Sequence, residues 1–190
     1  MGPERSQIGR RPPSVEGWAG IPLLTFYYGV GATVETASAV DPITGLAARS
    51  ALLADLAHAV TPGSRTSLLA VFALDGLKEF EELHGVIEGR KLLRRLSDRL
   101  LAAVEGVGTG YHPRSDEFAI LVTGKVSASA ILADSVAALS EADRYYSVVA
   151  TVGHAVLPAE ASEPIEALIV ADRRLTAASP KRAPRRVDAR

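Results

Sequence analysis

Acidic residues and one lysine stand in the chain at positions where a divalent metal or a phosphate could be bound. Asp75 directly follows the apolar run Ser67–Leu74, and Lys78 comes three residues later, near an expected helix start. Asp116 and Glu117 lie together between two short apolar segments. Carboxylates are the ligands that magnesium prefers, and a lysine can contact phosphate as a point charge. Charged residues in a hairpin turn or near a helix start are more often only solvated, so both interpretations stay open.

Hydrophobic periodicity predicts the elements that position these residues. The nearly unbroken apolar run Ser67–Leu74 is typical of a strand buried on both faces. Leucines at helical spacing precede and follow it, with a break at Gly85. Two short apolar segments then flank Arg114–Glu117 at the spacing of a hairpin. The expected helices are 46–60, a stretch to Leu83, one from beyond Gly85 to about Glu105, 128–139 and 164–178, and the expected strands are 67–74, 109–113, 118–123 and 146–155.

The order of these elements is α-β-α-α-β-β-α-β-α. Such an order describes an α+β domain in which helices cover the faces of one sheet. The chain has 190 residues, which is the size of one globular domain with modest extensions. We therefore expect one globular domain.

Composition excludes several classes of site. The chain has no cysteine, which excludes disulfide scaffolds, cysteine-ligated zinc, iron–sulfur clusters and thiol catalysis. No secretion signal opens the chain, and the apolar stretch Ile21–Val34 is shorter than a membrane span of about 20 residues. We therefore expect a cytoplasmic protein without a membrane span.

Charge is divided unevenly along the chain, although the net charge is −1. Residues 173–190 carry seven basic residues against one acidic residue, and residues 1–12 carry three against one, so the stretch 13–172 is acidic overall. An acidic body argues against nucleic-acid binding by the fold, and we expect no direct DNA binding. The basic tail is expected to be disordered and solubilising, or else to contact an anionic partner.

A resemblance to a known family rests on four segments, which are Asp41–Leu46 with Arg49, Leu74–Lys78, the loop Arg114-Ser115-Asp116-Glu117-Phe118, and Thr151–Ala155 with Ala171-Asp172. In this order they resemble the motifs of the GGDEF domain, the family of diguanylate cyclases and their inactive relatives. The resemblance covers residues 41–180. It implies a nucleotidyl-cyclase-like fold, with a central and mostly antiparallel sheet flanked by helices.

The family joins two GTP molecules into cyclic di-GMP, and the resemblance implies what such a site needs. Metal-bound carboxylates neutralise phosphate charge and help a 3′-hydroxyl to attack an α-phosphate. In the family, one carboxylate ends the buried strand and another lies in the hairpin loop, whose tip glycines let the backbone approach the nucleotide. Polar side chains on the helices after the strand hold the guanine edge.

The metal position and the base positions of the family carry different residues here. Ala73 replaces the first aspartate of the strand, so one metal ligand is lost, while Asp75 retains the second. Glu81 replaces the asparagine that contacts guanine and offers only acceptors. Arg90 replaces the aspartate that also contacts guanine and offers only donors.

The loop and phosphate positions are changed as well. Arg114 and Ser115 replace the two tip glycines, and Ser179 replaces a lysine that contacts phosphate. The inhibitory R-x-x-D motif of the family is missing, since Glu105 and Gly108 stand in its place. The residues that remain as possible contacts to a nucleotide or metal are Asp75, Lys78, Asp116 and Glu117.

These losses together predict a degenerate GGDEF domain without cyclase activity, acting as a regulatory or protein-interaction module in bacterial signalling related to cyclic di-GMP. We expect a protein partner or self-association, and no cofactor. The alternatives are a sensor that binds GTP without turnover and, less favoured, a residual diguanylate cyclase, which would need Mg²⁺. The expected organisation is a disordered lead at 1–17, an arm of unassigned conformation at 18–40, the degenerate domain at 41–180 and a basic disordered tail at 181–190.

Overall fold

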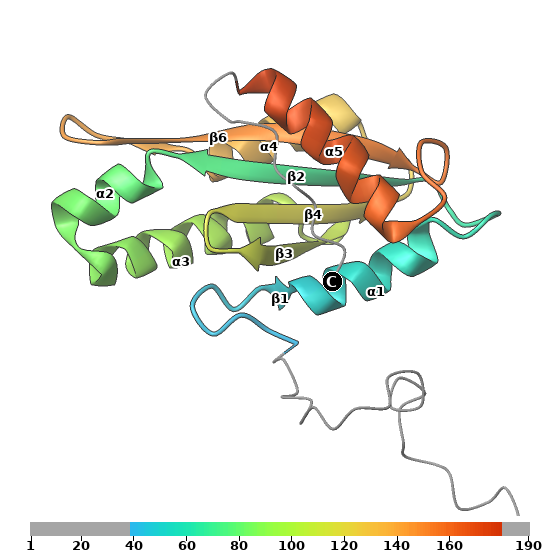
Figure 1. Ribbon diagram of the computed structural model, residues 1–190, viewed down its shortest axis with the longest axis horizontal. Coiled ribbons are helices and arrows are strands. Elements are labelled where there is room, and N and C mark those ends of the chain that lie inside the picture. Colours follow the sequence, from blue (N-terminus) through green and yellow to red (C-terminus); the bar gives the residue numbers. More distant parts are fainter. Residues whose placement is uncertain (1–38, 180–190) are drawn as a thin grey trace, which may run out of the picture. The chain divides into compact units, whose positions relative to one another are not determined.

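The structure, a computed structural model, describes residues 39–179 (Figure 1). Three predicted segments lie wholly or mostly outside the described residues. They are the lead at 1–17, the arm at 18–40 except for its last two residues, and the basic tail at 181–190. None of the helices within residues 39–179 has the length and hydrophobicity of a membrane span. The strands are β1 (Ala47–Ala48), β2 (Ser67–Asp75), β3 (Gly108–Arg114), β4 (Glu117–Thr123), β5 (Glu141–Ala142) and β6 (Ser147–Leu157), and the helices are α1 (Arg49–Ala59), α2 (Leu77–His84), α3 (Val86–Ala103), α4 (Ala128–Ala138) and α5 (Pro164–Ala178).

The described strands form one sheet in the order β1-β3-β4-β2-β6-β5. β2 lies inside the sheet because its apolar run can be buried on both faces, and it pairs antiparallel with β4 and β6. Among the described strands, the two-residue β1 alone pairs in parallel, with β3. A mostly antiparallel sheet flanked by helices confirms the predicted α+β fold class.

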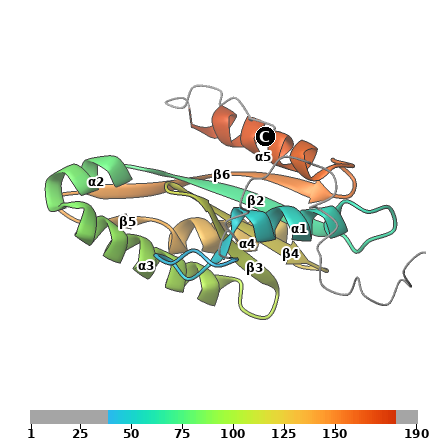
Figure 2. The ribbon, with the colours of Figure 1, turned by 60° about the horizontal axis from the view of Figure 1, so that its bottom comes forward.

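Side chains of β2 alternate between two hydrophobic cores. Leu68 and Phe72 pack with α2, α3 and α4 on one face, and Leu69 and Ala73 pack with α1 and α5 on the other. Figure 2 shows α5 and α3 on opposite sides of the sheet. Because Ala73 and Asp75 are two residues apart on the strand, both belong to the face that α5 covers.

The predicted start of the first helix is wrong. The helix begins at Arg49 rather than near Leu46, because Asp41 closes a turn before it. Asp41 Oδ1 accepts hydrogen bonds from the backbone N–H groups of Ile43 and Thr44 at 3.1 and 2.7 Å. Leu46 lies outside α1 and packs in the core that α3 covers, not with the leucines of α1.

The other elements follow the predicted order with small shifts. The two hairpin strands extend further into the hairpin than predicted: β3 ends at Arg114 and β4 begins at Glu117. Ser115 and Asp116 therefore form the turn. β6 extends to Leu157, two residues past its predicted end. The strands β1 and β5 are not predicted, because two residues carry no periodicity.

An ion pair fixes α5 to β6 and to the turn that follows it. Arg174 of α5 donates from Nη1 to the carbonyl oxygen of His154 at 2.8 Å and forms a bidentate pair with Glu160 at 2.8 and 2.6 Å. Glu160 also accepts from the backbone N–H of Val156 at 2.7 Å. The bond from Arg174 first, and the bond from Val156 second, lower the pKa of Glu160 to about 2.

We expect Glu160→Gln to remove part of the acid sensitivity of folding. A carboxyl with a lower pKa in the folded state stabilises the fold above its ordinary pKa of 4.5, and this contribution is lost as pH falls toward about 2. The contribution is modest, since Glu160 and Arg174 are 32% and 43% exposed and solvent screens the pair. Urea unfolding at a series of pH values should show a steeper loss of stability below about pH 5 in the wild type than in Glu160→Gln. Parallel curves for the two proteins would contradict this role.

Candidate functional site

A cleft of about 640 Å³ opens where β2 ends, and its walls come from α2, α3 and the β3–β4 turn. We call it the Asp75 cleft. Antiparallel pairing brings the turn beside the end of β2, where the Leu74 N–H donates to the carbonyl oxygen of Asp116 at 3.0 Å. The cleft gathers six residues singled out in the sequence, which are Asp75, Lys78, Glu81, Arg90, Ser115 and Asp116. The other singled-out residues, Ala73, Arg114, Glu117, Phe118 and Ser179, are not part of its lining.

The turn from β2 into α2 sets the rim of the cleft. Gly76 has a φ of 91°, in the left-handed region that favours glycine, and it caps the start of α2. A Cβ at this position would run into the carbonyl oxygen of Ser147 in β6. Glycine therefore lets the strand pass directly into the helix, which places Asp75 and Lys78 at the same rim.

Ala73, which stands where the family has a metal ligand, has no side-chain atom that can bind a metal. Ala73 is 0% exposed and lies in register between Glu117 of β4 and Thr151 of β6. Asp75 keeps a carboxylate, but its Oδ2 accepts hydrogen bonds from Thr151 Oγ1 at 3.2 Å and from Ser179 Oγ at 3.4 Å. Within residues 39–179, no group of three or more acidic or histidine side chains is placed to hold a metal ion. Because Ala73 has no ligand atom in its side chain and Asp75 already accepts from two hydroxyl groups, the strand does not supply the carboxylate that the metal of a cyclase needs.

The signature loop is held by contacts among its own residues. Arg114 Nε lies 3.7 Å from Glu117 Oε2, and the Glu117 side chain is 8% exposed. Phe118 is fully buried in the core of the sheet. Ser115 and Asp116 form the tip and line the cleft. Side chains thus stand at both positions where the family has tip glycines, and the buried Glu117 pairs with one of them.

The two positions that correspond to guanine contacts carry side chains of opposite charge. Glu81 of α2 lies across Gly89 of α3, since a Cβ at position 89 would be 2.5 Å from Glu81 Cγ and 2.6 Å from Oε1. Gly89 is buried, and its missing side chain leaves the space that the Glu81 carboxylate occupies. Arg90 is exposed and lines the same cleft. A ligand in the cleft would meet acceptors at Glu81 and donors at Arg90.

Lys78 is a largely exposed residue at the rim. Its side chain is 85% exposed, and its Nζ lies 3.6 Å from Glu82 Oε1, one turn further along α2. Exposed ion pairs at this spacing are weak, so the pair with Glu82 leaves the Lys78 ammonium able to bind another group. Lys78 therefore fits a surface charge and a phosphate contact equally well.

His112 lines the cleft, and the sequence did not predict it as a site residue. It is 7% exposed, its Nδ1 lies 3.3 Å from Asp41 Oδ1, and its Nε2 is buried without a hydrogen-bond partner among residues 39–179. Burial alone would raise the pKa of Asp41, but hydrogen bonds from Thr44 and the attraction of His112 hold it below its usual value. The carboxylate favours a proton on Nδ1, and burial keeps Nε2 out of reach of solvent.

Comparison with known proteins relates this fold to one family. A family model described as "Diguanylate cyclase, GGDEF domain" matches residues 38–185. No curated protein matches the chain. At identities near one fifth, solved structures such as those below show a shared fold and no more.

Three solved structures illustrate the likeness. The GGDEF domain of FimX from Pseudomonas aeruginosa has a TM-score of 0.66 and 22% identity, covering 77% of this chain and 96% of that chain. The diguanylate cyclase SiaD from Pseudomonas aeruginosa, in complex with its activator SiaC, has a TM-score of 0.64 and 21% identity, covering 76% and 59%. The GGDEF domain of DgcB from Caulobacter crescentus, in complex with c-di-GMP, has a TM-score of 0.63 and 21% identity, covering 78% and 94%.

Proposed function

The chain belongs to the GGDEF domain family, and we propose that it is a catalytically inactive member of that family. In this proposal it acts as a cytoplasmic regulatory module in signalling related to cyclic di-GMP. It does so by binding a protein partner or by pairing with another GGDEF domain. The fold of the family is retained, whereas the metal, base and loop positions of the family all carry other residues.

The observation that carries the proposal is the methyl group of Ala73 at the metal position. Phosphoryl transfer depends on metal-bound carboxylates that neutralise charge around the reacting phosphate. A methyl group buried in β2 cannot supply that charge, and Asp75 on the same face already accepts hydrogen bonds from Thr151 and Ser179. The loss of one such carboxylate is expected to cost several kcal/mol of transition-state stabilisation.

Exposed apolar side chains near the cleft support a role in protein binding. Leu83, Val86 and Ile87 are 63%, 57% and 72% exposed at the α2–α3 junction. The rings of His84 and Tyr146 meet edge to face with centroids 5.7 Å apart, which places the junction beside the β5–β6 turn. Exposed apolar side chains gathered in one place are typical of protein interfaces. SiaD, which has a similar fold, is in complex with its activator protein.

Incubating the purified chain with GTP and Mg²⁺ or Mn²⁺ tests the proposal. We expect no cyclic di-GMP above the level of a boiled control, because the metal, base and loop positions are all changed. An active diguanylate cyclase assayed in parallel is the positive control. Cyclic di-GMP that accumulates with time and with protein concentration would overturn the proposal and favour a residual cyclase.

A second candidate function is a sensor that binds GTP without turning it over. The observation in its favour is the Asp75 cleft, whose 640 Å³ lies within the range of about 300–1,000 Å³ for ligand pockets. The lining offers cationic groups at Lys78 and Arg90. Four acidic residues face the same cleft and oppose a triphosphate that arrives without a metal, and these are Asp75, Glu79, Glu81 and Asp116.

Calorimetry and thermal melting with GTP, GDP and cyclic di-GMP separate the two candidates. For an inactive interaction module we expect no heat of binding and no change in melting temperature. A ligand at 100 times its Kd stabilises the fold by about 2.7 kcal/mol, which moves a melting curve visibly. A shift with GTP that Arg90→Glu abolishes would favour the sensor.

A further inference from the structure

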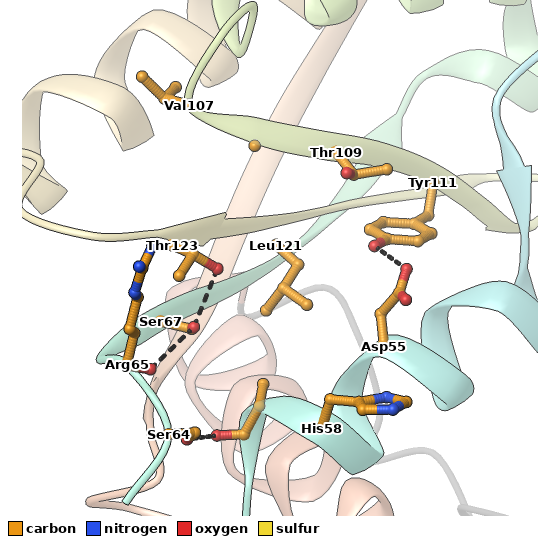
Figure 3. A pocket seen from close by; sticks show the side chains of 12 residues that line it. Asp55, His58, Ser64, Arg65, Ser67, Val107, Thr109, Tyr111, Leu121 and Thr123 are labelled. Carbon is orange, nitrogen blue, oxygen red and sulfur yellow. Dashed lines mark hydrogen bonds between the residues drawn. The ribbon is translucent and has the colours of Figure 1, made fainter.

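A second cavity, of about 440 Å³, lies at the other end of β2 (Figure 3). Its wall includes Ser67, the first residue of the strand, whereas Asp75 at the opposite end lines the cleft described above. A strand rises about 3.3 Å per residue, so the two ends lie about 25 Å apart. The two cavities share no lining residue and are separate sites.

Residues of opposite charge face this cavity from different elements. Asp55 and His58 come from α1 and Arg65 from the α1–β2 loop, and Leu121 of β4 lies between Asp55 and Arg65 (Figure 3). We call it the Asp55–Arg65 pocket. The Arg65 guanidinium forms no ion pair or hydrogen bond with residues 39–179. Among the described residues, a cation without an ionic partner thus stands at one end of the pocket and a carboxylate at the other.

Hydrogen bonds hold the acidic end of the pocket in place. The Tyr111 hydroxyl donates to Asp55 Oδ2 at 2.6 Å, and Tyr111 is itself 1% exposed. Burial first, and the bond to Asp55 second, raise the pKa of Tyr111, so its hydroxyl stays a donor. His58 Nδ1 donates to the carbonyl oxygen of Ala54 at 2.8 Å, which leaves Nε2 as an acceptor. Asp55 Oδ1 and His58 Nε2 can therefore both accept from a ligand.

The pocket differs in chemistry from the inhibitory product site of the family. Gly108, in its wall, stands where that site has an aspartate, and Glu105 stands where it has an arginine. A Cβ at position 108 would be 2.7 Å from Val122 Cγ2 and 2.8 Å from the carbonyl oxygen of Leu121. The wall leaves no room for a side chain there, so a cyclic dinucleotide would meet neither of the groups that the family uses.

We propose that the Asp55–Arg65 pocket binds a small zwitterion of the amino-acid type. The ligand carboxylate pairs with the Arg65 guanidinium, whose planar fork suits carboxylates. The ligand ammonium donates to Asp55 Oδ1 and His58 Nε2. Val107 and Leu121 supply apolar contact for the carbon chain between the two charges. The inference is independent of the proposed function, because no residue of the Asp75 cleft takes part.

Two-dimensional NMR of the isotope-labelled full chain, titrated with glycine, β-alanine and γ-aminobutyrate, tests the inference. These probes carry the same two charges at increasing separation. We expect at least one of them to shift the backbone resonances of Thr109 and Leu121 while those of α2 stay unchanged. Butyrate and butylamine, which each carry one of the charges, are expected to bind about tenfold or more weakly.

Charge-removing variants show which side chains are responsible. Arg65→Gln and Asp55→Asn are each expected to weaken binding about tenfold or more. Arg173→Gln removes an exposed arginine of α5 outside the pocket and should leave affinity unchanged. Arg65→Gln should also melt at the wild-type temperature, since Arg65 is exposed in a loop. No shift with any zwitterion at millimolar concentration, equal binding of the half-ligands, or equal loss in Arg173→Gln would overturn the inference.

Discussion

Gly153→Ala is expected to destabilise the fold by about 3 kcal/mol or more. Gly153 lies in β6, in register with Val71 of β2, on the face that α5 covers. A Cβ at this position would run into the carbonyl oxygen of Ala171 and the backbone nitrogen of Leu175. Both are backbone atoms of α5, which cannot rotate away as a side chain would. The whole helix therefore has to move off the sheet.

That movement would disrupt a core that contains three fully or almost fully buried residues of α5, namely Ala167, Ala171 and Leu175. Urea unfolding measures the loss. Gly110→Ala in β3 is a matched control, because a Cβ there would meet Leu46 Cδ2 at 3.4 Å, an ordinary contact. We expect the control to change stability by no more than about 1 kcal/mol. Wild-type stability in Gly153→Ala would contradict the close approach of α5 to β6.

The sequence patterns that predict the fold well are those that need no distant partner. The apolar run Ser67–Leu74 predicts β2, because a strand buried on both faces shows no polar alternation. Pro164 in the first turn, with an apolar stripe after it, predicts α5 with both ends correct. Leu46 misleads, because it has helical spacing to the leucines of α1 but packs in the other core. Spacing alone does not say which of two cores receives an isolated leucine.

The candidate site is predictable only where a local sequence pattern marks its residues. Strand alternation and the family resemblance single out Asp75 and the hairpin turn, and the structure brings them to one cleft. The partners are not predictable, since Thr151 and Ser179 donate to Asp75 from β6 and from the end of α5. His112 and Asp41 likewise meet across about half of the domain sequence. Such contacts depend on strand register and helix packing, which no local pattern records. The Asp55–Arg65 pocket draws on scattered polar residues that form no motif.

Ala73→Asp is expected to destabilise the fold by about 3 kcal/mol or more at neutral pH and to restore no cyclase activity. The new carboxyl would be buried in register between Thr151 and Glu117, and Glu117 is itself a buried acid. Burial and a neighbouring carboxylate both favour the protonated form, so the pKa of the new group rises in the folded state. The folded state then binds the proton more readily than the unfolded state. The destabilisation therefore grows as pH rises and shrinks as pH falls, which urea unfolding at several pH values measures.

Ala73→Asn is the matched control, because it adds the same shape without a charge. We expect a smaller loss of stability and little dependence on pH. Cyclase activity is measured on the same samples with GTP and Mg²⁺. The variant keeps Glu81 and Arg90 at the base positions and side chains at the two tip positions of the loop. Restoring the carboxylate at position 73 should therefore give no cyclic di-GMP. Turnover by Ala73→Asp would mean that the fold tolerates the base and loop changes, and that one residue separates this chain from a working cyclase. The proposal of a joint loss would then reduce to the loss of a single metal ligand.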